Sequence, residues 1–320
     1  MDFTAAIRAY NAADRLPTIL TRLREQTDAD AIAWEVLIVD NNSRDGTAAV
    51  VEQFRQTWPD RIPLRYVNEA QQGASYARRR AIDEAQGIWI GFLDDDNWPA
   101  PNWVRSILDF AETRPRASVL VGQIHGQFEV EPPKNFQQIA HFLPVIERSR
   151  KAFCYNTYRH AKKKVMPPGA GMAVKRQVWL DCVPKKLVLK GPVGTSLTAK
   201  GEDIEALLHM VNQGWEVWFN PDQHIDHHIP RWRFERAYLL KFFRGVGLGR
   251  YQTRKLSYPR WKWPLMVPVY FANDLRKWAV FWWRHRRELG GDVVAASQME
   301  MLTYTLVSPF YLLRQRLWRP

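Results

Sequence analysis

Two apolar segments in the first hundred residues end abruptly on aspartate. Residues 34–39 lead into Asp40, and residues 88–93 lead into the run Asp94-Asp95-Asp96. Apolar runs of this length are typical of strands that are buried on both faces of a sheet. Helical patterns alternate with these strands, so the sequence predicts an α/β fold with a mostly parallel sheet flanked by helices.

The alternation can be followed through the first 125 residues. Strands are predicted at residues 3–7, 34–40, 64–67 and 88–93, and helices at about 13–26, 47–58 and 75–86. In such sheets ligands bind at the carboxyl ends of the strands. We therefore expect the chemistry at one edge of the sheet, where residues 8–11, Asp40 and Asp94 would meet.

The run Asp94-Asp95-Asp96 is the densest acidic cluster of the chain. Adjacent carboxylates repel one another, and a buried strand end would not tolerate them without a cation. Mg²⁺ and Mn²⁺ bind one or two carboxylates and complete their coordination with phosphate oxygens and water. The alternative is a solvated turn in which Asn97, Trp98 and Pro99 end the strand.

Local structure explains part of the segment after Asp40. Asp45 and Thr47 are suited to cap the helix that begins there. Asp40 itself closes the strand, where a carboxylate can accept hydrogen bonds from a nucleobase or a ribose. The G-x-G-x-x-G and G-x-x-x-x-G-K-[ST] sequences are not present, which disfavours a dinucleotide fold and a P-loop. We interpret the glycine-bearing stretches 122–126 and 245–249 as packing or turns.

Two further motifs carry ionisable side chains. Residues 201–208 begin a helix, and acids in a first turn favour the helix dipole, so Asp203 has a structural explanation beside a catalytic one. A later segment holds three histidines within five positions, His224, His227 and His228. Their spacing fits neither a zincin helix nor a zinc finger, so they are either ligands or ordinary core and surface residues.

The charge of the chain lies in its last part. The net charge is +13, and residues 229–320 hold 18 Lys and Arg against 5 Asp and Glu, a surplus of 13. The same residues hold seven of the 15 tryptophans. The sequence therefore predicts a neutral globular body over residues 1–228 and a helical, basic, aromatic-rich region over residues 229–320.

Three observations bear on the compartment. The two cysteines, Cys154 and Cys182, are too few for a disulfide framework or a four-ligand zinc site. The N-terminal residues show no basic region leading into an apolar run, so no secretory signal is expected. No uncharged apolar stretch reaches about 18 residues, so no spanning helix is predicted. A cytoplasmic location is expected.

Taken together, the motifs resemble family 2 of the inverting glycosyltransferases, which use the GT-A fold. The matching segments lie in the family's order over about residues 3–230 and comprise 7–11, 39–47, 73–78, 92–97, 168–172, 201–203 and 227–228. Residues 122–133 and 273–277 resemble the hormogonium polysaccharide biosynthesis branch. The resemblance implies a GT-A domain over residues 1–228, with a donor-binding half at about 1–125 and an acceptor half at about 126–228.

The resemblance also implies a donor-nucleotide site. Tyr10 and Asp40 would hold the uracil and the ribose. The residues of this site would be Ala9, Tyr10, Asn11, Asp40, Gly73, Arg78, Asp94 and Asp95. This pocket could be altered by two departures from the family pattern. They are Arg8-Ala9 in place of Pro-Thr and Arg79 in place of Asn.

The remaining roles follow from the same resemblance. Asp94 and Asp96 would be the ends of the D-x-D signature. Asp96 would bind Mn²⁺ or Mg²⁺, and His227 or His228 would reach the metal or the diphosphate. The region of the acceptor and the donor sugar would contain Gly169, Ala170, Gly171 and Glu202. Asp203 would be the general base.

The implied reaction is a single displacement with inversion. A divalent cation would stabilise the leaving nucleoside diphosphate, and Asp203 would take the proton of the attacking hydroxyl. The expected donor is a nucleotide sugar, with UDP as the nucleotide. The expected acceptor is a glycan or a lipid-linked glycan in polysaccharide or exopolysaccharide biosynthesis.

Two other functions are compatible with parts of the sequence. A nucleotidyltransferase of similar fold also uses carboxylate-bound magnesium. The basic region could bind nucleic acid, but RRM, KH and helix-turn-helix signatures are not visible, so nucleic acid is not an expected partner.

We expect instead that residues beyond about 230 dock on the cytoplasmic face of a membrane, as interfacial helices over 266–283 and 301–313. The tryptophans in that prediction are Trp261, Trp263, Trp278, Trp282, Trp283 and Trp318. The alternative is that these helices pack on the body or form a dimer contact.

Overall fold

A computed structural model describes residues 1–148, 150–158, 166–193 and 197–317, so Trp318 lies outside the described residues. The chain divides into two compact units. The first comprises residues 1–127, 144–186 and 209–229, and the second comprises residues 128–143, 187–208 and 230–320. The first unit ends at residue 229, next to the predicted boundary at 228/229. Residues 128–143 and 187–208 belong to the second unit, together with the C-terminal helices. The predicted domains stay a prediction.

In the described part of the chain, nine strands form one sheet in the first unit, in the order β3-β2-β1-β4-β8-β6-β9-β5, with β7 paired to β9. The strands are β1 (Phe3–Ala9), β2 (Trp34–Asp40), β3 (Leu64–Asn68), β4 (Trp89–Asp94), β5 (Asn97–Pro99), β6 (Ala117–Phe128), β7 (Phe153–Cys154), β8 (Ala173–Lys175) and β9 (Glu216–Ile229). The strands β3, β2, β1 and β4 are parallel, and β8 pairs antiparallel to both β4 and β6. The α/β class is thus confirmed, with antiparallel strands added to the predicted parallel part.

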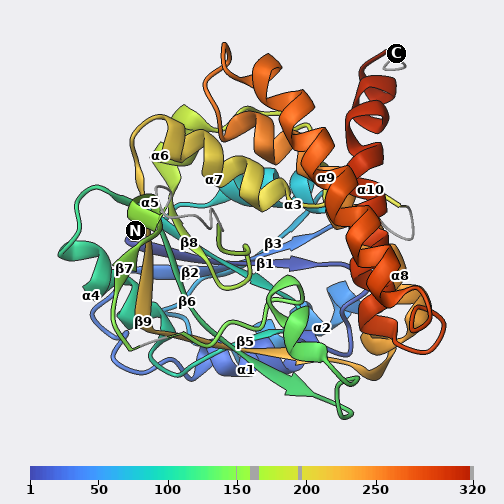
Figure 1. The fold of residues 1–320 in the computed structure, drawn as a ribbon. Coiled ribbons are helices and arrows are strands. Elements are labelled where there is room, and N and C mark those ends of the chain that lie inside the picture. Colours follow the sequence, from blue (N-terminus) through green and yellow to red (C-terminus); the bar gives the residue numbers. More distant parts are fainter. Residues whose placement is uncertain (149, 159–165, 194–196, 318–320) are drawn as a thin grey trace. The chain divides into compact units, whose positions relative to one another are not determined.

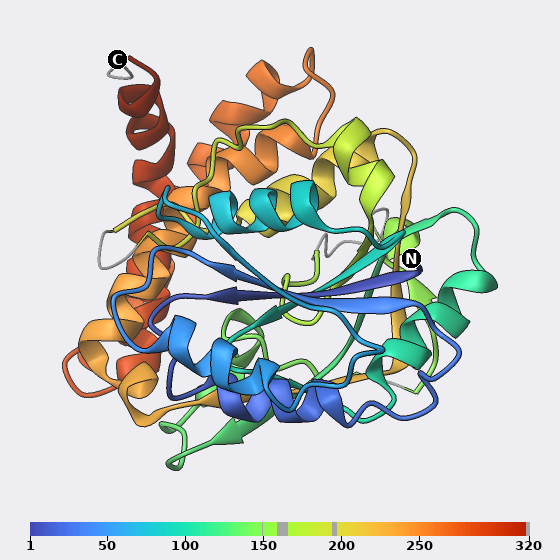
Figure 2. The same cartoon turned by 180° about the vertical axis from the view of Figure 1, so that it is seen from behind.

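Helices cover both faces of the parallel strands. On one face lie α1 (Leu16–Arg24) and α2 (Thr47–Arg55), and on the other lies α3 (Ala74–Glu84) (Figures 1 and 2). These three helices and the four parallel strands occur where the sequence predicts them, with ends that differ by at most three residues. The other helices of this unit are α4 (Trp103–Glu112), α5 (Tyr155–Tyr158) and α6 (Arg176–Cys182).

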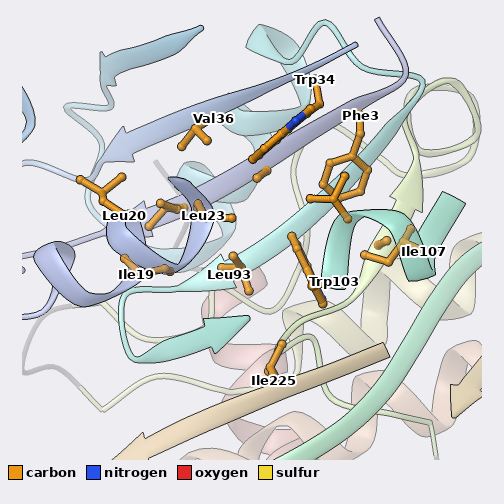
Figure 3. Close-up of a cluster of buried hydrophobic side chains, with 14 of the residues drawn as sticks. Phe3, Ile19, Leu20, Leu23, Trp34, Val36, Leu93, Trp103, Ile107 and Ile225 are labelled. Atoms are coloured by element: carbon orange, nitrogen blue, oxygen red, sulfur yellow. The ribbon is translucent and has the colours of Figure 1, made fainter. Parts of the chain in front are cut away.

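The core of the first unit lies between the sheet and the helices α1 and α4. Figure 3 shows its side chains, among them Phe3, Leu93, Trp103 and Ile107. Phe3 and Trp103 are fully buried and meet edge to face with ring centroids 5.5 Å apart. Burial of each large side chain is worth about 1.5–3 kcal/mol, and the ring geometry adds about 0.5–1.5 kcal/mol. This packing fixes β1 against α4, and β1 pairs with β4, whose end carries the acidic cluster.

The second unit is mainly helical. Its long helices are α8 (Arg236–Leu256), α9 (Trp263–His285) and α10 (Val293–Leu317), and α10 packs along α8 and contacts α9. Short 3-10 turns are η1 (Phe136–Gln138), η2 (Ala140–Phe142) and η3 (Arg231–Phe234), and α7 (Glu202–Asn212) begins in this unit. Among the described residues, no helix has the length and hydropathy needed to cross a membrane.

The glycines of α8 confirm the packing interpretation of residues 245–249. A Cβ on Gly247 would lie 2.7 Å from the carbonyl oxygen of Met301, so this glycine lets α10 approach. A Cβ on Gly249 would lie 2.0 Å from the carbonyl oxygen of Lys200. Because Gly249 has no side chain, the backbone at Lys200, just before α7, can lie directly against α8.

Candidate active site

The ends of three parallel strands meet at one edge of the sheet. Ala9 at the end of β1 is in register with Asp40 at the end of β2, and Arg8 is in register with Asp94 at the end of β4. The convergence expected from the sequence is therefore present. Tyr10 follows directly after β1 with 39 % of its surface exposed. Its ring is accessible to a ligand at this edge.

Two arginines neutralise the first two acids of the cluster. The Arg8 guanidinium donates to Asp94, and the Arg15 guanidinium donates to Asp95 at 2.9 Å. Burial and the neighbouring Asp96 nevertheless raise the pKa of Asp95 to about 6. Asp94 and Asp95 therefore have guanidinium groups of the protein as counter-ions, and the predicted metal at this cluster stays a prediction.

Arg15 also joins the ends of two strands. Its guanidinium donates to the carbonyl oxygen of Asn11 at 2.8 Å while it binds Asp95. The loop after β1 is held further by Asn11, whose amide oxygen accepts from Arg44 N at 2.9 Å, and whose N donates to Ser43 Oγ at 2.9 Å. The loops after β1 and β2 and the end of β4 thus form one hydrogen-bonded network.

Asp96 has a different environment from the other two acids. It is buried, its Oδ1 accepts a hydrogen bond from Asn97 Nδ2 at 2.9 Å, and its Oδ2 lies 3.8 Å from His227 Nε2. His227 Nδ1 lies 3.1 Å from the carbonyl oxygen of Pro144. A carbonyl only accepts, so Nδ1 carries the hydrogen, and in the neutral ring the lone pair of Nε2 faces the Asp96 carboxylate.

The three clustered histidines take separate positions on β9. His227 faces Asp96, whereas the ring of His228 stacks on Trp98 at 5.1 Å between centroids. His224 Nδ1 lies 2.9 Å from His125 Nε2 on β6. Among the described residues, no group of three or more His, Cys, Asp and Glu side chains has the arrangement of a metal site.

Asp40 is buried and hydrogen-bonded within the protein. Its Oδ1 accepts from Ser43 N at 2.9 Å, and its Oδ2 accepts from the Tyr66 hydroxyl, whose pKa is raised by burial and by this carboxylate. Each carboxylate oxygen has a second lone pair that a nucleoside could use.

The start of α2 bears on the capping prediction. Asp45 Oδ1 accepts from Thr47 N at 3.1 Å, at the first residue of the helix. The Thr47 hydroxyl instead accepts from Ala12 N at 2.9 Å. Asp45 therefore supports the helix start, and Thr47 ties it to the β1 loop.

Two predicted nucleotide-site residues lie at α3. Gly73 N donates to the Asn41 side chain at 2.7 Å, next to the end of β2. Arg78 is buried, and its guanidinium lies 5.4 Å from the centroid of the Phe92 ring.

The segment Gly169-Ala170-Gly171 precedes β8. Gly171 has a positive φ of 65°, and its carbonyl oxygen accepts from Gln223 Nε2 of β9 at 2.6 Å. A Cβ at this position would lie 2.7 Å from Ile225 Cδ1. The segment is thus closely packed on β9, the strand that also carries His227.

The predicted base belongs to the second unit. Glu202 is buried at the start of α7, and Asp203 Oδ1 accepts from Ile204 N at 2.8 Å. Burial lowers the pKa of the nearby Lys200 to about 8. Glu205 is buried and accepts from Leu189 N at 2.8 Å and from Gln252 Nε2 at 2.9 Å. Glu205 therefore has a structural role in holding α7 to α8 and to the segment before it.

Three side chains of this site escaped the sequence argument. Arg15 carries no local signal, because its contact depends on how the start of α1 faces the end of β4. Only the alternative of a solvated turn gives Asn97 a role, as a residue that ends the strand, yet its side chain donates to Asp96. Tyr66 binds Asp40 across neighbouring strands. In the sequence, Arg8 is a departure from the family pattern, but this does not predict its contact with Asp94.

Comparison with protein families and curated relatives gives consistent matches. The family model described as glycosyl transferase family 2 matches residues 4–181. The putative teichuronic acid biosynthesis glycosyltransferase TuaG of Bacillus subtilis is 36% identical over 91 residues, which are 28% of this chain and 34% of that protein. The succinoglycan biosynthesis protein ExoM of Rhizobium meliloti is 25% identical over 236 residues, 72% of this chain and 69% of that protein. The chain thus spans about a third of the first of these relatives.

Solved structures share the fold. The mannosyltransferase PcManGT from Pyrobaculum calidifontis, in complex with GDP-Man and Mn²⁺, superposes with a TM-score of 0.60 and 16% identity over 97% of this chain and 86% of that chain. S. aureus TarS 1–349 in complex with UDP-GlcNAc gives a TM-score of 0.51 and 14% identity over 98% of this chain and 92% of that chain.

Proposed function

Because the chain belongs to glycosyl transferase family 2, we propose that it transfers a sugar from a nucleotide sugar to an acceptor hydroxyl in polysaccharide biosynthesis. The observation that carries this proposal is the edge of the sheet where Tyr10, Asp40 and Asp96 follow three neighbouring parallel strands. Relatives named for succinoglycan and teichuronic acid biosynthesis support the polysaccharide assignment. The narrower resemblance to the hormogonium polysaccharide branch remains a prediction.

UDP is the nucleotide that we propose for the donor. The exposed ring of Tyr10 can stack on a base, and the remaining lone pairs of Asp40 can accept from the base or the ribose. Ala9, Asn11, Gly73, Arg78, Asp94 and Asp95 are proposed as the rest of this site. S. aureus TarS binds UDP-GlcNAc, whereas PcManGT binds GDP-Man. The two donors differ in their nucleobase, so the identity of the nucleobase needs a direct test.

The residues around Asp96 fit a divalent cation. The Asp96 carboxylate and the Nε2 lone pair of His227 face each other at 3.8 Å, and Asn97 and Pro144 fix their orientations. One carboxylate and few protein ligands suit Mg²⁺ or Mn²⁺, which also bind substrate phosphates. We propose that Asp96 and His227 hold the metal, which when bound would supply Lewis-acid stabilisation of the leaving diphosphate.

Asp203 is proposed as the general base of an inverting displacement. The acceptor hydroxyl attacks the anomeric carbon, its proton passes to a carboxylate oxygen of Asp203, and the sugar–phosphate bond breaks to release the nucleoside diphosphate. Glu202 and the backbone of Gly169, Ala170 and Gly171 are proposed to line the region of the sugar and the acceptor. A lipid-linked glycan as acceptor would accord with the location that we propose, at the inner face of the cell membrane.

A product assay tests the reaction. The protein is incubated with a panel of labelled nucleotide sugars, a glycan acceptor and Mn²⁺. Release of nucleoside diphosphate with a labelled glycan is expected, whereas release of pyrophosphate would assign the protein to the nucleotidyltransferases.

The base is tested by a matched pair of variants. Asp203→Asn keeps the shape but cannot accept the proton, so turnover should fall by about 10²- to 10⁴-fold with little change in donor affinity. Glu202→Gln is the control at the neighbouring position and should retain more activity. An inactive Glu202→Gln beside an active Asp203→Asn would reverse the two roles.

A further inference from the structure

The helix α9 has an inward face that is fixed within the second unit. Trp263 and Asp274 are buried on this face. Asp274 accepts two hydrogen bonds from the Arg254 guanidinium of α8, and Trp278 Nε1 donates to Thr303 Oγ1 of α10 at 3.0 Å. These contacts fix the rotation of α9 about its own axis, so its opposite side is turned outward.

The outward side of α9 carries exposed apolar side chains, and the exposed Arg276 lies among them, about three turns after Leu265. At about 3.6 residues per turn, Leu265 and Trp283 lie on one line along the helix, five turns apart, and Val269 lies one turn after Leu265. Trp261, just before the helix, continues this line. The exposed fractions are 69% for Trp261, 67% for Leu265, 59% for Val269 and 67% for Trp283. We call these four residues the α9 face, and an exposed apolar surface of this kind marks an interaction site.

The α9 face is surrounded by positive charge. Residues 260–287 contain one acid, the buried Asp274, and seven exposed cations, Arg260, Lys262, Arg276, Lys277, Arg284, Arg286 and Arg287. Lys262 Nζ lies 4.8 Å from the centroid of the Trp261 ring, and the Arg286 guanidinium carbon lies 5.9 Å from that of Trp283. Cations therefore lie at both ends of the apolar line and, with Arg276, along it, so they belong to the same surface.

We propose that the α9 face docks on an anionic lipid bilayer, with α9 lying in the plane of the interface. Tryptophan rings favour the depth of the lipid headgroups, aliphatic side chains enter below them, and Lys and Arg bind the lipid phosphates. Charge complementarity decides the occupant, because a second copy of the chain would set seven cations against seven like charges. This binding does not require sugar transfer, so its failure and the failure of the proposed reaction are distinguishable.

Vesicle co-sedimentation of the full chain, without nucleotide sugar, tests the proposal. The protein should sediment with vesicles of phosphatidylglycerol and phosphatidylcholine at low salt, and high salt should release it. Leu265→Glu/Trp283→Glu should weaken binding by about tenfold or more, because it places two carboxylates in the apolar line. Ile88→Glu is the matched control, since Ile88 is 61% exposed in the first unit and its replacement should leave binding unchanged.

A second variant keeps the test independent of folding effects. Arg276→Glu/Lys277→Glu changes exposed positions and should weaken binding to anionic vesicles in the same way, and circular dichroism verifies that each variant is folded. Binding of both variants at the wild-type level, or equally tight wild-type binding to phosphatidylcholine alone, would overturn the proposal. A wild-type dimer that Leu265→Glu/Trp283→Glu dissociates, without vesicle binding, would assign the face to self-association and overturn it as well.

Discussion

Replacing Gly249 by alanine tests whether α8 positions the segment that leads to the proposed base. In an ordinary helix interior this change stabilises a protein by about 1 kcal/mol, because alanine has the better helix propensity. Here the new Cβ would lie 2.0 Å from the carbonyl oxygen of Lys200, which is backbone. An ordinary van der Waals contact begins at 3.4 Å, so the helix and the segment must separate.

The displacement opposes an existing attachment. Lys200 N donates to the carbonyl oxygen of Gly245 at 2.9 Å, so the segment is held to α8 one turn before the new clash. Overpacking of this kind costs about 1–3 kcal/mol, which exceeds the gain in helix propensity. We therefore expect Gly249→Ala to lower the free energy of unfolding.

Two measurements check this expectation. Denaturant unfolding followed by circular dichroism should give a lower midpoint for Gly249→Ala, while Gly290→Ala, whose Cβ would meet no atom within 4 Å, should unfold like the wild type. Turnover should fall by about 10²-fold if Asp203 is displaced by about 1 Å, with donor affinity preserved. Equal stability of the two alanine variants would refute the reasoning.

Two further predictions concern the metal and the partly buried Lys200. Asp96→Ala removes a proposed metal ligand and should greatly weaken binding of the nucleotide sugar in calorimetry with Mn²⁺, and wild-type affinity that persists in EDTA would contradict the metal assignment. Burial lowers the pKa of Lys200 from 10.5 to about 8, so between these pH values the unfolded chain binds a proton that the folded protein does not, and stability rises with pH across that window. Lys200→Met should abolish this rise of the free energy of unfolding, measured by denaturant unfolding below and above the pH window. If the free energy of unfolding of the variant still rises with pH as in the wild type, another group causes the rise.

The order of strands and helices in the first 94 residues was readable from local patterns. Buried parallel strands require apolar side chains on both faces. The segments Val36–Val39 and Ile90–Leu93 can therefore be recognised as strands from their own residues, without knowledge of the neighbouring strands. The antiparallel strands were harder to predict, since β5 and β8 have three residues each and are defined by their pairing. The glycines of α8 were recognised as packing residues, but their partners could not be known.

The sequence by itself determined the family, the α/β class and the placement of carboxylates at the strand ends, because these depend on residue type, order and spacing. The tertiary structure decided what those carboxylates contact. Asp94 and Asp95 bind guanidinium groups, whereas Asp96 faces a histidine that β9 contributes 131 residues later in the chain. The same holds for α9, where the contacts of Asp274 and Trp278 select which side of the helix is exposed. Such contacts join residues that are distant in sequence, and local patterns carry no information on which distant groups the packing of the core brings together.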